Sequence, residues 1–439
     1  MHSLKRKIDA GQEYVRDMTK RIKLRLSKQR RGAGRFDILP SEVIHIIATS
    51  LDREAMCALR ATCRYLRNST QYHWQHNYSV HTIRTDFSKH SLKRLQKLCK
   101  HRELVLKVET LLIQEPRRTV FGKGFSWKRG NYGGSSEMLR YDQDAVREWQ
   151  AVFSKLINCR SFIFHAAPEA HRPTPNLTAT DALVVLLYIL AGSDIPAESL
   201  FVKFDRLYGA QRESSGVDPE RLSAHEMLAI PGFQHACTSI HTLTITGAMR
   251  RGESIFASML PYTRALQRLV VRHCWDRESA PLSTALGDLA REPAPRFHLR
   301  EFEYSRSLFD RTHIPGTDTT EHFTTFLASQ NESLRKLVLG PLTVFRQSVD
   351  PVLVSLRDNN ASLEDITIRD LQWWPNRMRL RFPGIERNPV VDEQLGTRFE
   401  YSDRVVGDRT DRTPVMMVRY AGPRMDLALK RLVADAVHE

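Results

Sequence analysis

The sequence predicts an α/β protein in which a short helical segment precedes an irregular solenoid of parallel strands and helices. Two observations support this fold class. Within residues 36–80 apolar residues recur at helical spacing, and further along the chain a short apolar unit with the spacing i, i+3, i+5 recurs many times. The composition, with 41% hydrophobic and 26% charged residues among 439, is typical of a globular protein with a substantial core.

Residues 1–35 are expected to form a basic, disordered leader. They contain twelve Lys or Arg residues against three acidic ones, which accounts for more than half of the formal net charge of +16. The run from Lys20 to Arg31 would suit a nuclear importer or contacts with phosphates, and a solvated leader is the alternative. There is no signal-peptide core and no apolar run of membrane-spanning length. We therefore expect the chain in the cytoplasm, the nucleus or both, with no membrane partner.

The segment 36–80 predicts three helices that carry more apolar surface than so short a piece of chain can bury. Leu39-Pro40 marks the first helix start, because proline is tolerated where the backbone N–H has no partner. Two apolar stripes follow at helical spacing, Val43, Ile44, Ile46, Ile47 and Leu51 in the first helix and Met56, Leu59, Cys63 and Leu66 in the second. A third short piece reaches Trp74. About forty residues rarely fold without disulfides, metal or a partner, so we expect a docking surface.

This segment resembles the F-box, the motif by which substrate receptors of SCF-type ubiquitin ligases dock on a Skp-type adaptor. The residues that carry the resemblance are Leu39, Pro40, Glu42, Ile47, Leu51, Cys63, Arg64 and Trp74. Ala55-Met56 departs from the family pattern, where leucines are usual, and so does Leu66, where Trp is frequent. The resemblance implies an adaptor, a cullin scaffold beyond it, and adaptor-binding residues Leu39, Pro40, Val43, Ile47, Leu51, Leu59 and Cys63. The alternative is a helical hairpin packed on its own protein.

Residues 81–375 show the repeating apolar unit. Its clearest copies begin at Ile240, Leu266, Leu299, Leu334 and Leu363, and fainter copies begin at Val108, Cys159 and Leu200. Each interval between the clear copies holds one amphipathic helical pattern, which predicts strand, loop and helix in turn. A further helix is expected from Asp142 to Ile157.

The unit resembles the Leu-x-x-Leu-x-Leu core of the leucine-rich repeat, although the Asn that usually closes that consensus is absent and the periods are uneven. The resemblance implies an irregular solenoid whose strands align in one parallel sheet, and an ordinary α/β domain is the alternative. Residues 376–439 would form a C-terminal cap region, with an amphipathic helix from about Met425 to Val437.

A long insertion, 114–141, interrupts the repeat region. Its glycines alternate with aromatic residues, among them Trp127, and it carries several Lys and Arg side chains without the spacing of a phosphate-binding loop. Long loops in compact domains are often functional or disordered, so we expect a mobile loop that contacts a substrate.

The inner face of the expected sheet would be lined by the residues between the apolar positions. Such a long surface suits a protein substrate, and a solvated face of mixed charge is the alternative. The candidate substrate-binding residues are Arg268, Glu301, Glu303, Lys336, Asp365 and Trp127.

The sequence predicts no catalytic residue, cofactor or metal site. It lacks the motifs of zinc proteases, serine hydrolases and dinucleotide-binding enzymes, and its six cysteines include no Cys-x-x-Cys pair. Together with this absence, the F-box resemblance implies a non-catalytic, substrate-recognition subunit of an SCF ubiquitin ligase. Two alternatives stay open: an F-box scaffold outside ubiquitin transfer, and a nucleic-acid-binding protein that uses the basic leader and the glycine-aromatic loop.

Overall fold

The computed structural model describes residues 39–51, 53–74, 81–114, 120–131, 137–166, 176–204, 224–246, 255–274, 280–292, 296–308, 319–340, 342–345, 350–359, 361–374, 378–406 and 413–438. The chain divides into two compact units, Met1–Val80 and His81–Glu439. The expected basic leader, 1–35, lies outside the described residues.

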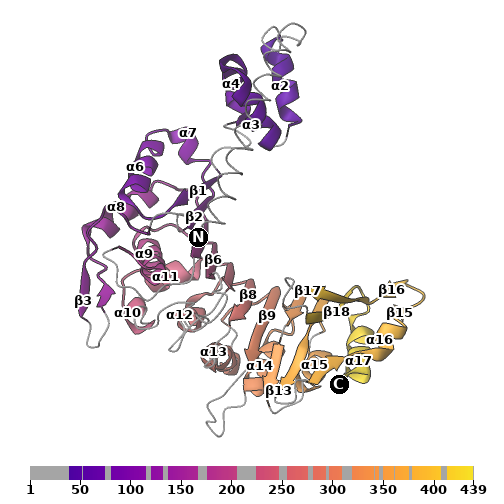
Figure 1. Cartoon of the computed structure of the whole chain (residues 1–439). Helices are drawn as coiled ribbons and strands as arrows, with labels where there is room; N and C mark the ends of the chain where they lie inside the picture. Colours follow the sequence, from indigo (N-terminus) through magenta and orange to yellow (C-terminus); the bar gives the residue numbers. More distant parts are fainter. Residues whose placement is uncertain are drawn as a thin grey trace, which may run out of the picture. The chain divides into compact units, whose positions relative to one another are not determined.

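The described part of the first unit is helical (Figure 1). Its helices are α2 (Ser41–Thr49), α3 (Arg53–Thr62), α4 (Arg64–Ser69) and α5 (Gln71–His73). Pro40 precedes α2, and its carbonyl oxygen accepts hydrogen bonds from the backbone N–H groups of Val43 and Ile44. The apolar side chains buried in this unit are Ile44, Ala48, Met56 and Leu66.

The second predicted helix is divided at Cys63. The backbone of Cys63 is extended, with φ −155° and ψ 166°, and its Sγ accepts a hydrogen bond of 3.5 Å from the N–H of Leu66. Helix α3 therefore ends before Cys63, and Cys63 is the N-cap of α4. The apolar spacing does not reveal this boundary, because Met56 before the cap and Leu66 after it are both buried.

The second unit is built on a large, mostly parallel sheet. From one edge its parallel strands are β1 (Thr82–Thr85), β2 (Thr110–Gln114), β5 (Ser161–Ala166), β6 (Ser199–Phe204), β7 (Thr242–Thr246), β8 (Arg268–Cys274), β9 (Glu301–Leu308), β10 (Lys336–Leu339) and β12 (Asp365–Arg369). All eight predicted strand units lie in this run, and β1 is a strand that the apolar spacing does not indicate. In most units the first apolar residue precedes the strand: Leu266 lies before β8, and Leu269 and Val271 are buried within it. Leu200 is the exception, because it lies within β6.

Helices cover one face of this sheet (Figure 1). The longer ones are α6 (Lys89–Leu98), α8 (Asp144–Phe153), α9 (Ala179–Gly192), α13 (Ala280–Arg291), α14 (Thr319–Ser329) and α15 (Asp350–Asn359). Helix α8 lies within the predicted range 142–157. Helix α9 is apolar all round because it is buried between its neighbours, and Thr178 and Asp181 form a capping box at its start.

Two of the parallel strands turn a corner and continue. After Gly340, β10 leads into β11 (Leu342–Phe345), and after Asp370, β12 leads into β13 (Leu371–Trp374). Gly340 has φ +103° and Asp370 has φ +39°. A Cβ at Gly340 would overlap the carbonyl oxygen of Arg369, so only glycine fits there. Strand β11 pairs in parallel with β13 and with the end of β9.

Antiparallel strands follow the last parallel one. Strand β18 (Thr413–Ala421) pairs with β12, and β17 (Glu400–Val406) pairs with β18. Shorter elements of this region are β14 (Met378–Arg381), α16 (Pro383–Arg387), β15 (Val390–Asp392), β16 (Thr397–Arg398) and β19 (Val437–His438). The amphipathic helix expected near Met425 is α17 (Met425–Asp435), which contacts α15.

The described part of the insertion 114–141 packs against the rest of the unit. Phe121 and Trp127 are buried, and β3 (Arg129–Asn131) pairs with β4 (Glu137–Leu139). The Arg129 guanidinium binds both carboxylate oxygens of the buried Asp181, at 2.9 and 2.5 Å, and so ties the insertion to α9. The described part of the insertion therefore differs from the mobile loop that its length predicts, because Phe121 and Trp127 are buried.

Candidate functional site

The predicted adaptor-binding residues occupy the outside of the first unit. Pro40, Val43 and Cys63 are exposed, and Leu39, Ile47, Leu51 and Leu59 are half-buried. None of these seven belongs to the buried set that holds the described helices together. On α2 the two sets interleave: Ile44 and Ala48 face the core, and the residue before each of them, Val43 and Ile47, reaches solvent. The unit therefore keeps a second apolar surface outside its own core.

Three further side chains add to this outer surface. Ile46 is 66% exposed and Tyr72 is 64% exposed, and the exposed Tyr65 donates a hydrogen bond of 3.0 Å from its hydroxyl to the carbonyl oxygen of Leu39. The sequence places Ile46 in the first apolar stripe, but nothing in the spacing distinguishes it from the residues that are buried. The two tyrosines carry no sequence signal for this position.

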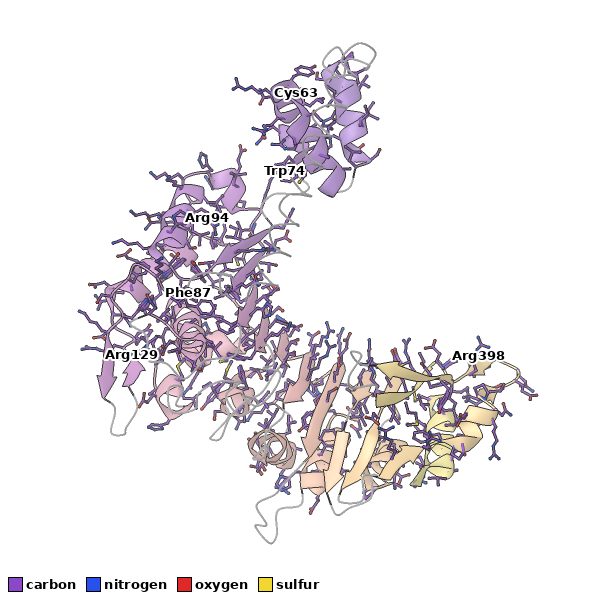
Figure 2. All side chains as sticks on the ribbon, viewed as in Figure 1. Cys63, Trp74, Phe87, Arg94, Arg129 and Arg398 are labelled. Atoms are coloured by element: carbon purple, nitrogen blue, oxygen red, sulfur yellow. The ribbon has the colours of Figure 1, made fainter. Side chains whose placement is uncertain are left out.

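Arg60 fixes the last helices of the unit. Its guanidinium donates to the carbonyl oxygen of Arg67 at 2.9 Å and to Gln71 Oε1 at 2.6 Å, and it lies 5.0 Å from the ring centroid of Trp74. Partial burial and the neighbouring Arg67 lower the pKa of Arg60. Figure 2 labels Cys63 and Trp74 on this unit. Arg60 therefore joins α3 to α4, α5 and Trp74.

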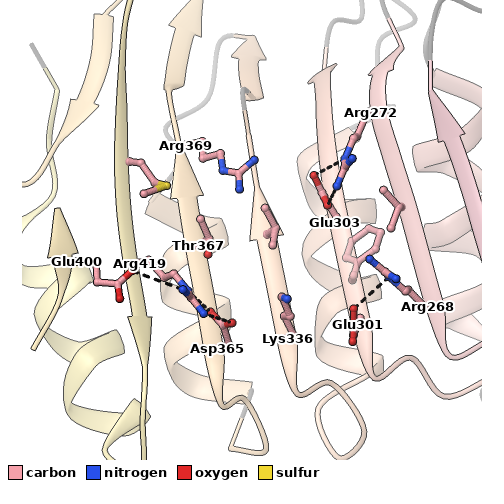
Figure 3. Close-up of a pocket in the computed structure, with 14 residues that line it drawn as sticks. Arg268, Arg272, Glu301, Glu303, Lys336, Asp365, Thr367, Arg369, Glu400 and Arg419 are labelled. Carbon is pink, nitrogen blue, oxygen red and sulfur yellow. Dashed lines mark hydrogen bonds and ion pairs between the residues drawn. The ribbon is translucent and has the colours of Figure 1, made fainter. Parts of the chain in front are cut away.

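In the second unit, sheet register aligns the predicted substrate-binding residues. Arg268, Glu301, Lys336 and Asp365 are successive partners across β8, β9, β10 and β12. Glu303 lies two residues beyond Glu301 and so on the same face. Figure 3 shows these side chains in front of the sheet, with helices behind it. All five line one open cavity of about 350 Å³.

The carboxylates that line this cavity form ion pairs with arginine side chains. Arg268 contacts Glu301 at 3.1 Å, and Arg272 holds Glu303 with two hydrogen bonds of 2.7 and 2.6 Å. On the other side, Arg419 of β18 donates two hydrogen bonds to Asp365, at 3.2 and 3.0 Å. The same guanidinium lies 3.5 Å from Glu400. The hydrogen bonds from Arg272 and Arg419 to these carboxylates raise the pKa of both guanidinium groups.

The floor of the cavity is apolar at its centre. Val270 and Val338 are buried, and Thr367 of β12 lies beside Val338 in the sheet register. Sequence reasoning missed Arg272, Arg369, Glu400 and Arg419, which also line it. Arg272 directly follows the last apolar residue of its unit, which is a usable signal, whereas Arg419 comes from an antiparallel strand that the repeat pattern does not include.

Trp127, the remaining predicted substrate-binding residue, lies away from this cavity. Its side chain is buried, and its Nε1–H donates a hydrogen bond of 2.8 Å to the carbonyl oxygen of Gly122. Little of the Trp127 side chain is accessible to a partner, and Trp127 does not line the cavity formed by the other five residues.

Two of the described thiols, Cys159 and Cys237, are buried. Burial raises the pKa of Cys159 and Cys237 to about 12, so both thiols are protonated at neutral pH. Among the described residues no group of three or more His, Cys, Asp or Glu side chains could hold a metal ion. Over the same residues, no helix has the length and apolar character needed to span a bilayer.

Comparisons with known proteins leave the family open. No protein-family model matches the chain, and a search of curated proteins gives no match.

Proposed function

We propose that this protein is the substrate-recognition subunit of an SCF-type ubiquitin ligase, acting in the cytoplasm, the nucleus or both. Its first unit would dock on a Skp-type adaptor, and the adaptor would join it to a cullin scaffold. The open face of its parallel sheet would bind a protein substrate. The subunit would contribute no chemistry of its own and would act by holding the substrate near the transferring enzyme, which raises the effective concentration of the reacting groups.

The observation that carries this proposal is that none of the seven F-box positions is buried in the unit. Adaptor docking requires apolar side chains that the unit does not use for its own core, and these seven meet that requirement. Ile47 and Leu51 are half-buried and do not belong to the set of apolar side chains buried within the described part of the unit. Their half-buried state, beside a separate core around Met56, supports a docking role.

The scaffold alternative requires the same adaptor surface and differs only in what the complex does. The nucleic-acid alternative depends on the basic leader, which lies outside the described residues, and on the glycine-aromatic loop. In that loop Trp127 is buried and Arg129 is bound to Asp181, so these two groups are not available for base stacking or phosphate contact. We therefore favour the ubiquitin-ligase subunit.

The test is complex formation with a Skp-type adaptor, measured by co-elution of the full chain in size-exclusion chromatography. The test variant is Leu39→Asp with Ile47→Asp, which places charge in the apolar surface. A matched control, Ser41→Asp with Ser50→Asp, adds the same charge at exposed polar positions of the same helix region. We expect the parent and the control to co-elute with the adaptor, and the test variant to elute alone.

Circular dichroism of each variant verifies that the helices are retained. If the parent does not bind the adaptor, the proposed function is wrong. Adaptor binding that the test variant retains would assign docking to a different surface. Adding a cullin scaffold separates the scaffold alternative, because a scaffold protein outside ubiquitin transfer would bind the adaptor without entering the larger complex.

A further inference from the structure

More cationic than acidic side chains line the cavity on the sheet. Five cationic and four acidic side chains line it. Each of the four carboxylates lies within 4 Å of a guanidinium, and the guanidinium groups involved are Arg268, Arg272 and Arg419. Among the residues that the structure describes, Lys336 and Arg369 have no acidic partner, and no dashed line reaches either of them in Figure 3. The acidic groups are therefore neutralised, whereas two cations are not.

The two unpaired cations have a defined separation along the sheet. Lys336 begins β10, and Arg369 ends the neighbouring strand β12 beside Gly340. Gly340 lies four positions after Lys336, which corresponds to about 13 Å along the strand at the usual rise per residue. Between them lie the buried side chains of Val338 and Thr367.

An extended segment laid along these strands repeats the same spacing. Its side chains i, i+2 and i+4 point to one side, with about 13 Å between the first and the third. Anionic groups at i and i+4 would reach Lys336 and Arg369, and an apolar side chain at i+2 would cover Val338. Both cations are half-buried and line the cavity.

We propose that this cavity binds an extended protein segment with the pattern acid-x-apolar-x-acid. The inference rests on the proposed function and deepens it by naming the class of segment that the receptor would select. Either carboxylate or phosphoryl oxygens supply the required charge at the two acidic positions. Nucleic acid fits less well, because Glu301, Glu303, Asp365 and Glu400 line the same cavity and would repel a continuous phosphate backbone.

The experiment measures fluorescence anisotropy of labelled nonapeptides with the full chain. One peptide carries Glu at both acidic positions around a central Leu, a second carries phosphoserine there, and a third carries Gln. A single-stranded oligonucleotide is the fourth probe. We expect one or both anionic peptides to bind, the Gln peptide to bind at least about tenfold more weakly, and affinity to fall as salt rises.

The test variant is Lys336→Gln with Arg369→Gln, and the matched control is Arg264→Gln with Lys430→Gln. Both remove two positive charges, and the control positions are exposed and do not line the cavity. Binding of the anionic peptide should weaken at least about tenfold in the test variant and stay unchanged in the control. The Glu peptide and the phosphoserine peptide, compared in the parent, decide which oxygen chemistry the site prefers.

A charge exchange keeps the proposal falsifiable if the test variant is less stable. Lys336→Glu with Arg369→Glu should lose the Glu peptide and gain a peptide that carries Lys at the two positions. Failure of both anionic peptides to bind, equal weakening in the control, or tighter binding of the oligonucleotide through the same two residues would overturn the inference. Adaptor co-elution of the same samples reports on the proposed function separately: adaptor binding without peptide binding overturns only the inference, and the reverse result overturns only the ligase role.

Discussion

At the scale of single residues, a few polar side chains decide how the described helices of the first unit are held. Few apolar side chains are buried in its described part, so the hydrogen bonds of one guanidinium contribute noticeably to its stability. Arg60 satisfies the carbonyl oxygen of Arg67 near the end of α4, binds Gln71 of α5 and lies over Trp74. Hydrogen bonds of charged groups to partly buried partners are worth more than exposed ion pairs, which is why this residue matters more than other arginines nearby.

We predict that Arg60→Met loosens α4 and α5. Loss of the charge-assisted hydrogen bonds should cost about 1–3 kcal/mol of local stability. Hydrogen exchange of the amides in 64–74, followed by mass spectrometry, should become at least about tenfold faster. Arg64→Met is the control, because Arg64 is exposed and should leave exchange unchanged. Equal protection in the two variants would show that Arg60 does not hold these helices.

At the scale of secondary structure, the corner after β10 shows how one backbone position fixes the path of a strand. Gly340 turns the chain at φ +103°, and its α-carbon lies against the carbonyl oxygen of Arg369 on the neighbouring strand. The Ser305 hydroxyl donates a hydrogen bond to the carbonyl oxygen of Gly340. The corner therefore joins three strands, and it sets the end of the cavity where Arg369 lies.

Gly340→Ala should destabilise the second unit strongly. The added Cβ meets backbone rather than a side chain that could move, so we expect a loss of at least about 3 kcal/mol. Gly396→Ala is the matched control: Gly396 also has positive φ, at +63°, but a Cβ there meets no atom within 4 Å. Its cost should be about 1 kcal/mol. Urea unfolding followed by circular dichroism measures both, and similar midpoints would contradict the steric explanation.

At the scale of the whole molecule, buried thiols couple folding to alkaline pH. Cys159 lies just before β5 and Cys237 lies in α11 (Phe233–Thr238). Burial raises the pKa of each from 9.0 to about 12, because the thiolate would lose its hydration in the core. Between these two values the unfolded chain releases protons that the folded chain keeps, so stability should fall as pH rises through this range.

The measurement is the free energy of unfolding in urea at several pH values above 8. The parent should lose stability with pH, and Cys159→Ala with Cys237→Ala should reduce the slope, although packing in this variant is weaker at every pH. An unchanged slope would assign the alkaline loss to other titrating groups. Thiol alkylation at pH 8 gives a second readout: the exposed Cys57 and Cys63 should react in the folded protein, and Cys159 and Cys237 only after unfolding.

Local apolar spacing was sufficient to predict much of the second unit. Each predicted strand unit is a strand of the parallel sheet. In seven of the eight units the spacing i, i+3, i+5 reflects one side chain that precedes the strand and two on its buried face, whereas Leu200, Val202 and Phe204 all lie within β6. The same alternation located five of the residues that line the cavity. Helix α17 was found for a similar reason, since its apolar stripe has the helical period.

The remaining features depend on contacts between distant parts of the chain. Local spacing cannot show that Arg419 of an antiparallel strand pairs with Asp365, that Trp127 finds a core, or that Asp181 binds Arg129. The sequence by itself predicted a mixed α/β fold, strands that align in a largely parallel sheet and helices in residues 36–80 with a high apolar content. Only the tertiary structure decided which of those apolar residues form the core, and which cations of the cavity have no acidic partner among the described residues, because burial and pairing depend on neighbours that the chain brings together by folding.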